Sequence, residues 1–160
     1  MCKPCGDMIV NLTHLPAMPA LHEGVRIRRA MAADHQCILD FIRQRFSENW
    51  AQEADAGLSA LPSRCLIAVK DKQILGFCCW DVSALDYFGP IGVDEAARGT
   101  GVGSALLIRA LEHMRDVGYG YAVIGWVSDA ADFYRKTVNA QFIPGGEPEN
   151  TVYANMIMFN

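Results

Sequence analysis

Apolar and polar positions along the chain follow two periods, and the shorter one indicates β-strands. Residues 25–28 alternate apolar and charged side chains, as a strand with one buried face does. Other strand-like stretches are short apolar runs bounded by polar, glycine or proline residues. The predicted strands are residues 8–12, 25–28, 64–69, 74–80, 85–93, 121–126, 140–143 and 152–159.

The longer period places apolar residues three or four positions apart, which indicates helices. Asp34 is the expected cap of the first helix, and Asp129 or Ser128 is the expected cap of the last. Gly118 is a helix stop, and residues 57–62 are expected to break a second helix. The predicted helices are residues 32–46, 47–56, 102–117 and 129–136. This order of elements predicts an α/β fold, with a mixed sheet and helices on both faces.

The stretch between the strand at 85–93 and the helix at 102–117 carries the clearest chemistry. Arg98 precedes three glycines at alternate positions, Gly99, Gly101 and Gly103. Glycines leave backbone N–H groups uncovered, and the first N–H groups of a helix have no partner within it. The helix dipole adds positive potential at the same place. The stretch therefore predicts an anion site, most often one for phosphate, with an empty glycine-rich turn as the alternative.

Two common phosphate-binding motifs do not fit this stretch. A P-loop needs a lysine after its last glycine, but Gly103 is followed by Ser104. The dinucleotide fingerprint needs a third glycine where this chain has Ser104 or Leu106, depending on the starting glycine. The remaining pattern is Arg-x-x-Gly-x-Gly, filled by Arg98, Gly101 and Gly103.

Composition narrows the function classes without selecting one. The 160 residues are 51% hydrophobic and 20% charged, which is typical of a single globular domain. A formal charge of -4 argues against a nucleic-acid partner. No apolar run reaches the roughly 20 residues that cross a bilayer, so no membrane partner is predicted. The N-terminus does not read as a secretory signal, which favours a cytoplasmic location.

The six cysteines fall into two groups of interest. Cys65, Cys78 and Cys79 lie in strand-like runs and are predicted to be small core residues, as suits a reducing compartment. Cys2 and Cys5 form a C-x-x-C pair, for which zinc or redox chemistry is the alternative to a structural or neutral role. No second pair is spaced to complete a zinc site, so no metal is predicted.

The glycine pattern and the order of elements resemble the GNAT superfamily, the acyl-coenzyme-A-dependent N-acyltransferases. The resemblance covers roughly residues 25–159, and the stretches 88–93 and 133–136 look like a subfamily of small bacterial GNAT proteins. It implies the GNAT fold, a mixed and mostly antiparallel sheet with a splayed central strand pair and helices on both faces. A bulge at Gly89-Pro90 is the expected cause of the splay, which in this family admits the pantetheine arm.

The same resemblance divides the chain in two. Residues 1–24 are an N-terminal extension, in which residues 8–12 would add a strand to this sheet or to a partner. Residues 25–160 are a single GNAT domain.

The resemblance also implies roles for individual residues. Tyr134 stands where the family places the tyrosine that protonates the coenzyme A thiolate, and Asp86 is the expected base. Ser128 stands where the family often has an asparagine that binds pantetheine. The residues implied in cofactor binding are Ile91, Gly92, Val93, Arg98, Gly99, Thr100, Gly101, Val102, Gly103, Ser104, Ser128 and Tyr134.

Each of these assignments has a purely structural alternative. Arg98 would instead pair with Asp94 or Glu95, Tyr134 would be a core aromatic, and Asp86 would be a solvated turn acid. Two interpretations are also open for three aromatic residues, which would either line an acceptor pocket or belong to the core: Phe46, Trp50 and Trp126.

The sequence therefore predicts an enzyme, an N-acetyltransferase. It would use acetyl-coenzyme A as co-substrate, without a metal, and acetylate a primary amine of a small molecule or peptide by direct attack. A non-catalytic acyl-coenzyme-A-binding or regulatory module is the alternative, and a structural protein with an empty turn is a third. A homodimer is left open.

Overall fold

The computed structural model describes residues 3–157. Within them, seven strands form one mixed sheet, accompanied by four α-helices and five 3-10 helices. The strands are β1 (Gly6–Asn11), β2 (Arg26–Arg29), β3 (Cys65–Lys70), β4 (Gln73–Trp80), β5 (Tyr87–Val93), β6 (Tyr121–Val127) and β7 (Gln141–Phe142). The helices are α1 (His35–Arg45), α2 (Glu48–Ser59), α3 (Val102–Asp116) and α4 (Ala131–Val138). The 3-10 helices are η1 (Leu12–His14), η2 (Ala32–Asp34), η3 (Glu95–Ala97), η4 (Pro148–Asn150) and η5 (Val152–Asn155).

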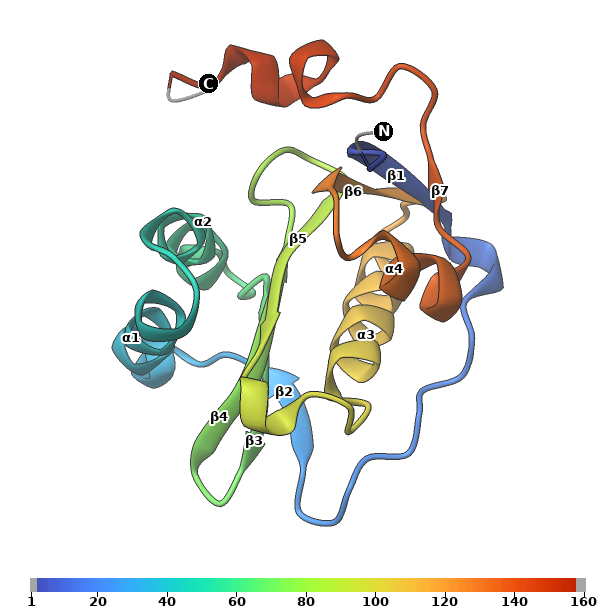
Figure 1. Ribbon diagram of the computed structural model, residues 1–160. Helices are drawn as coiled ribbons and strands as arrows, with labels where there is room; N and C mark the ends of the chain where they lie inside the picture. The colour runs from blue at the N-terminus through green and yellow to red at the C-terminus, as the bar shows by residue number, and fades with distance from the viewer. Residues whose placement is uncertain (1–2, 158–160) are drawn as a thin grey trace.

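The strand order is β2-β3-β4-β5-β6-β1-β7. Figure 1 shows α1 and α2 on one face of this sheet and α3 and α4 on the other. Side chains along each strand therefore face the two helical layers in turn, because successive side chains of a strand point to opposite faces of the sheet. Cys65 and Cys79 belong to the core beneath α1 and α2, whereas Cys78 belongs to the core beneath α3. The prediction that these three cysteines are core residues is confirmed.

The sheet opens between β5 and β6, its one parallel pair. Register is kept only at Tyr87 opposite Val123 and Phe88 opposite Ile124. Beyond that point β5 follows β4, with Val93 opposite Gly76, while β6 follows β1. The β4–β5 register shifts at Gly89-Pro90, so the predicted bulge and splay are confirmed.

Both ends of the chain contribute to the region beside β6. Strand β1 pairs antiparallel with β6 and with β7, so the predicted strand at 8–12 joins this chain's own sheet. The predicted C-terminal strand at 152–159 is wrong where it is described: residues 152–155 form η5, and residues 158–160 lie outside the described part. The position beside β6 is already taken by β1. The C-terminal segment crosses the top of the molecule instead (Figure 1).

The predicted caps of the first and last helices are wrong, because the side chains of Asp34 and Asp129 bind other partners. Asp34 does not cap α1, since its carboxylate binds the Arg28 guanidinium at 2.7 and 3.0 Å. Asp129 does not cap α4, which begins after Ala130, and instead pairs with Lys3 at 3.2 Å. The break expected at 57–62 is confirmed, since α2 ends at Ser59 within that range.

Gly57 does not break α2 because it serves packing. A Cβ atom there would lie 3.1 Å from Val82 and 3.2 Å from the Arg64 carbonyl oxygen, so glycine lets the helix approach the chain around β3 and β4 closely. Gly118, by contrast, follows the C-cap residue Val117 of α3 and adopts a positive φ of 116°, as a helix stop does.

None of the helices in the described part is both long and apolar enough to cross a bilayer. The described residues also contain no group of three or more His, Cys, Asp or Glu side chains that could hold a metal ion. Cys2 lies outside the described part, so a role for the Cys2–Cys5 pair stays a prediction.

Candidate active site

A cavity of about 1050 Å³ occupies the opening between β5 and β6. One end is formed by the glycine-rich loop and the start of α3, and the other by α2, the loop after β4 and the C-terminal segment. The lining residues used below are Trp50, Glu53, Ser83, Ile91, Gly92, Val93, Arg98, Gly99, Gly101, Gly103, Ser104, Trp126, Ser128, Tyr134, Tyr153 and Met156.

The glycine-rich loop gives the first end its anion-binding character. Gly101 is the residue before α3 and has a φ of 86°, in the left-handed region that favours glycine. The backbone N–H groups of Val102, Gly103 and Ser104 have no hydrogen-bond partner among residues 3–157. These free donors lie at the positive end of a helix of 15 residues. The loop is therefore built to receive an anion.

Arg98 is exposed beside this loop and is not tied to the neighbouring acids. Its Nε donates to the Val93 carbonyl oxygen at 3.4 Å, while Asp94 pairs with Arg45 at 2.9 Å. The alternative in which Arg98 pairs with Asp94 or Glu95 is therefore wrong for the described residues. The guanidinium remains available to an anion on the loop.

The backbone of β5 supplies further donors on the open side. Asp94 donates its N–H to Leu75 of β4 at 2.7 Å. Because backbone groups of a strand alternate in direction, Ile91 and Val93 direct theirs away from β4 and into the opening. The Gly92 N–H points the other way, toward β4. Gly92 also packs closely on the face of the sheet, where a Cβ atom would lie 2.5 Å from the Phe46 ring. Ile91 and Val93 thus offer N–H groups that no strand covers.

Tyr134 reaches the cavity from α4, between the two ends. The side chain is 6% exposed and its ring stands edge-on to Phe88, with a centroid distance of 6.4 Å. Its hydroxyl has no hydrogen-bond partner among the described residues. Burial raises the pKa of Tyr134 well above its ordinary value, so the hydroxyl stays protonated over the neutral range. Tyr134 is therefore a core aromatic that also lines the cavity.

Asp86, the expected base, is not among the residues that line the cavity. It lies just before β5, where β5 and β6 are still joined, and its carbonyl oxygen accepts the Val123 N–H at 3.0 Å. Burial and the nearby Asp81 raise the pKa of Asp86 to about 6. The raised pKa therefore arises from an acidic turn at the closed end of the strand pair.

The other predicted residues differ in whether their side chains face the cavity. Ser128 lines the cavity with an exposed side chain. Thr100 turns its hydroxyl to the Ala97 carbonyl oxygen, and Val102 is buried in the core, so neither side chain faces the cavity. These two residues contribute to the loop through their backbones only.

The second end contains residues that the sequence did not single out, together with Trp50 and Trp126. Glu53 on α2 accepts a hydrogen bond from Ser83 at 3.1 Å. Burial raises the pKa of Glu53, and burial raises that of Tyr153 to about 12. The only available signal was helical spacing from Trp50 to Glu53, because Ser83 and Tyr153 arrive from distant segments. Phe46 packs in the core instead of lining the cavity.

An internal carboxylate fixes the wall formed by Trp126. Asp7 on β1 is 3% exposed and accepts hydrogen bonds from the Trp126 N–H at 2.9 Å and the Tyr87 hydroxyl at 2.8 Å. Trp126 has a φ of 48°, which is unusual for a non-glycine residue. The Asp7 contact holds the backbone in that conformation and thereby links the N-terminal strand to the cavity.

Comparisons with known proteins fit this geometry. Residues 62–137 match the family model described as an acetyltransferase (GNAT) domain. No curated protein matches the chain significantly. A GCN5-related N-acetyltransferase from Sphaerobacter thermophilus is 20% identical with a TM-score of 0.70, over 88% of this chain and 48% of its own.

Two further solved structures have the same fold. The glucosamine N-acetyltransferase region of a fungal multi-domain β-N-acetylglucosaminidase is 14% identical with a TM-score of 0.69, over 86% of this chain and 19% of that one. A GCN5-related N-acetyltransferase from Kribbella flavida is 18% identical with a TM-score of 0.59, over 85% of this chain and 53% of its own. This chain thus spans about half or less of the length of these proteins.

Proposed function

We propose that this chain transfers an acetyl group from acetyl-coenzyme A to a primary amine, because it has the GNAT fold and residues 62–137 match an acetyltransferase (GNAT) domain model. The acceptor is a small molecule or a peptide, and no metal takes part. The observation that carries the proposal is one continuous cavity, which joins the glycine-rich loop, the uncovered edge of β5 and Tyr134. A cytoplasmic location and a homodimer belong to the same proposal.

The proposed cofactor contacts follow from the free donors. The N–H groups of Gly99 to Ser104 hold the pyrophosphate, and Arg98 adds a charge-assisted contact from the exposed side. The pantetheine arm lies in the opening between β5 and β6, where its amides pair with Ile91 and Val93 and pass Ser128. The thioester then reaches Tyr134.

The chemical step needs a neutral amine, a stabilised oxyanion and a protonated leaving group. The ammonium first loses one proton, and its lone pair forms the C–N bond at the thioester carbon. The uncovered β5 N–H groups stabilise the oxyanion. As the C–S bond breaks, Tyr134 gives its proton to the sulfur, while the nitrogen loses its second surplus proton to water. Water reprotonates Tyr134, so one proton is released per turnover.

The test is to titrate the purified protein with coenzyme A and then to follow free thiol with acetyl-coenzyme A and a panel of primary amines. We expect binding and a thiol release that depends on the amine. Binding without release would favour the non-catalytic module, which the absence of Asp86 from the cavity also favours. No binding at millimolar coenzyme A would overturn both readings.

A further inference from the structure

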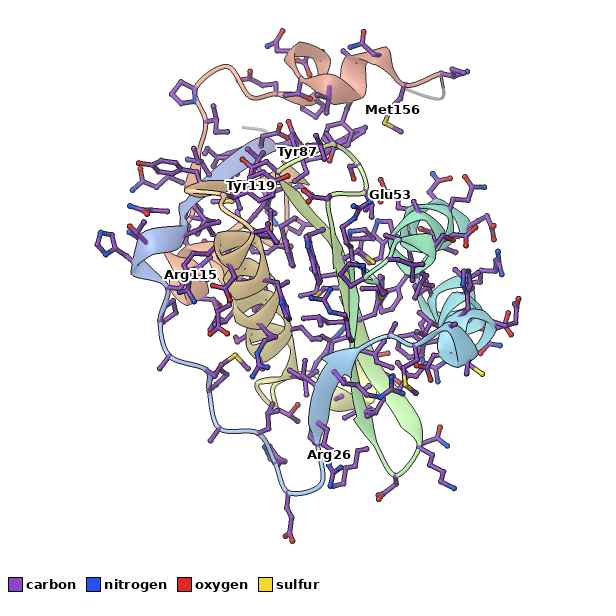
Figure 2. The ribbon with its side chains drawn as sticks, turned by 180° about the vertical axis from the view of Figure 1, so that it is seen from behind. Arg26, Glu53, Tyr87, Arg115, Tyr119 and Met156 are labelled. Atoms are coloured by element: carbon purple, nitrogen blue, oxygen red, sulfur yellow. The ribbon has the colours of Figure 1, made fainter. Side chains whose placement is uncertain are left out.

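The end of the cavity away from the glycine-rich loop contains a carboxylate that the catalytic scheme above does not use. Glu53 projects from α2, one turn after Asn49 and Trp50, and all three line the cavity. Its Oε1 accepts the Ser83 hydroxyl at 3.1 Å. Figure 2 shows Glu53 and Met156 at the same end of the molecule, on α2 and on the C-terminal segment.

Glu53 differs from the other carboxylates of α2 in having no basic side chain as a partner among residues 3–157. Glu48 pairs with Arg43 at 2.8 Å, and Asp55 pairs with His35 at 2.6 Å, both outside the cavity. No ion pair of Glu53 is formed within residues 3–157, although its side chain is half-buried. A half-buried carboxylate without a counter-ion is costly, and a bound cation would offset that cost.

The walls around Glu53 are aromatic and firmly placed. Trp126 and Tyr153 pack against each other with a centroid distance of 5.2 Å, and Trp50 stands on the same helix as Glu53. Tyr153 lies so close over Gly125 that a Cβ atom there would be 1.9 Å from its hydroxyl. Aromatic faces beside a carboxylate form an environment that attracts an ammonium group and accepts an apolar body next to it.

We propose that Glu53 binds the ammonium group of the acceptor, so that the substrate class is small primary amines with an apolar body beside the amino group. Glu53 also takes the first proton from that nitrogen and passes it to water at the cavity mouth. Ser83 positions the carboxylate, and Trp50, Trp126 and Tyr153 contact the apolar body. This inference rests on the proposed function, since it names the acceptor for the same cavity.

The experiment uses the full chain saturated with coenzyme A. The binding of phenethylamine, a cation at neutral pH, is compared with that of its neutral isostere 2-phenylethanol by tryptophan fluorescence or NMR. A charge-assisted hydrogen bond favours the amine by roughly 10- to 100-fold in the wild type. The preference should disappear in Glu53→Gln, which keeps the size of the side chain, and persist in Asp55→Asn, which removes a carboxylate from the outer side of the same helix.

Each outcome supports or overturns the inference separately from the proposed function. No preference for the amine in the wild type, or no binding of it, overturns the inference without recourse to any variant. A preference that survives in Glu53→Gln overturns it as well. Either result combined with normal coenzyme A binding and amine-dependent thiol release leaves the proposed function standing. Failure to bind coenzyme A removes the proposed function itself.

Discussion

The two ends of the cavity are built in different ways. The end at the glycine-rich loop uses backbone N–H groups from one continuous stretch, between β5 and the start of α3. The opposite end uses side chains from α2, the loop after β4, β6 and the C-terminal segment. A backbone cradle serves any ligand with the same diphosphate, whereas a set of side chains from separate segments can change its selectivity residue by residue. If the proposed function holds, the first end would bind the common co-substrate and the second a particular acceptor.

Tyr134, which lies between the two ends of the cavity, gives the sharpest test of this comparison. Tyr134→Phe removes only the hydroxyl that we place at the leaving sulfur. We expect acetyl transfer to fall by about 100-fold, because a lost general acid usually costs that much or more, while coenzyme A affinity stays within about twofold. Steady-state thiol release and calorimetric titration measure the two quantities. Tyr121→Phe, on the exposed face of β6, is the matched control, and an equal loss in both variants would refute the role of Tyr134.

The end of the cavity away from the glycine-rich loop, called the acceptor end below, depends on Asp7 of the N-terminal strand β1 for the position of Trp126. In Asp7→Asn the amide oxygen cannot accept from both the Trp126 N–H and the Tyr87 hydroxyl, so one of these donors loses its acceptor at a buried position. We expect the free energy of unfolding to fall by about 2 kcal/mol and the KM for the amine to rise. Denaturant unfolding measures the first quantity. Asp116→Asn on the surface should change stability by no more than about 0.5 kcal/mol, and equal effects of the two would contradict the link.

Coenzyme A binding at the glycine-rich loop should depend on backbone geometry more than on side-chain identity. Gly101→Ala strains a left-handed residue and places a methyl group at the cradle, so we expect coenzyme A affinity to drop by about 10-fold. Gly145→Ala introduces similar strain at a φ of 73° in a turn away from the cavity. Both variants should lose stability to a similar degree in thermal unfolding. Unchanged coenzyme A affinity in Gly101→Ala would show that the loop is not the anion site.

The smallest effect concerns Asp86, whose pKa is raised to about 6. A raised carboxyl pKa means that the folded state binds the proton more tightly than the unfolded chain. Wild-type stability therefore falls as pH rises from about 4 to about 6 and stays lower above that range. Asp86→Asn removes this loss, so we expect a gain of about 1 kcal/mol at pH 8, allowing for partial exposure, and none at pH 4.

The same variant separates the two carboxylates considered as base. Amine acetylation should fall far less in Asp86→Asn than in Glu53→Gln, since Asp86 does not line the cavity. Parallel kinetics of the two variants measure this difference. A larger loss in Asp86→Asn would restore the assignment made from the sequence.

The sequence predicted the features whose causes are local. The strand that ends at Val93, the bulge at Gly89-Pro90 and the glycines before α3 are all confirmed, because each follows from the properties of a few consecutive residues. Helix caps were less predictable. Asp34 and Asp129 have the side chains of good caps, but partners from other segments, Arg28 and Lys3, bind them first.

The acceptor end could not be predicted from the sequence because it too depends on contacts between distant segments. The sequence did not single out Glu53, and it predicted a strand over residues 152–159. The position of β1 beside β6 leaves the C-terminal segment free to cross the cavity, with Tyr153 over Gly125. Glu53 reaches the same cavity from α2, on the other side of the opening. By itself the sequence determined the glycine-rich loop and the order of the core elements, since short-range periodicity and backbone freedom encode them. Only the tertiary structure decided which carboxylate faces the cavity, because that depends on contacts between residues far apart in the chain.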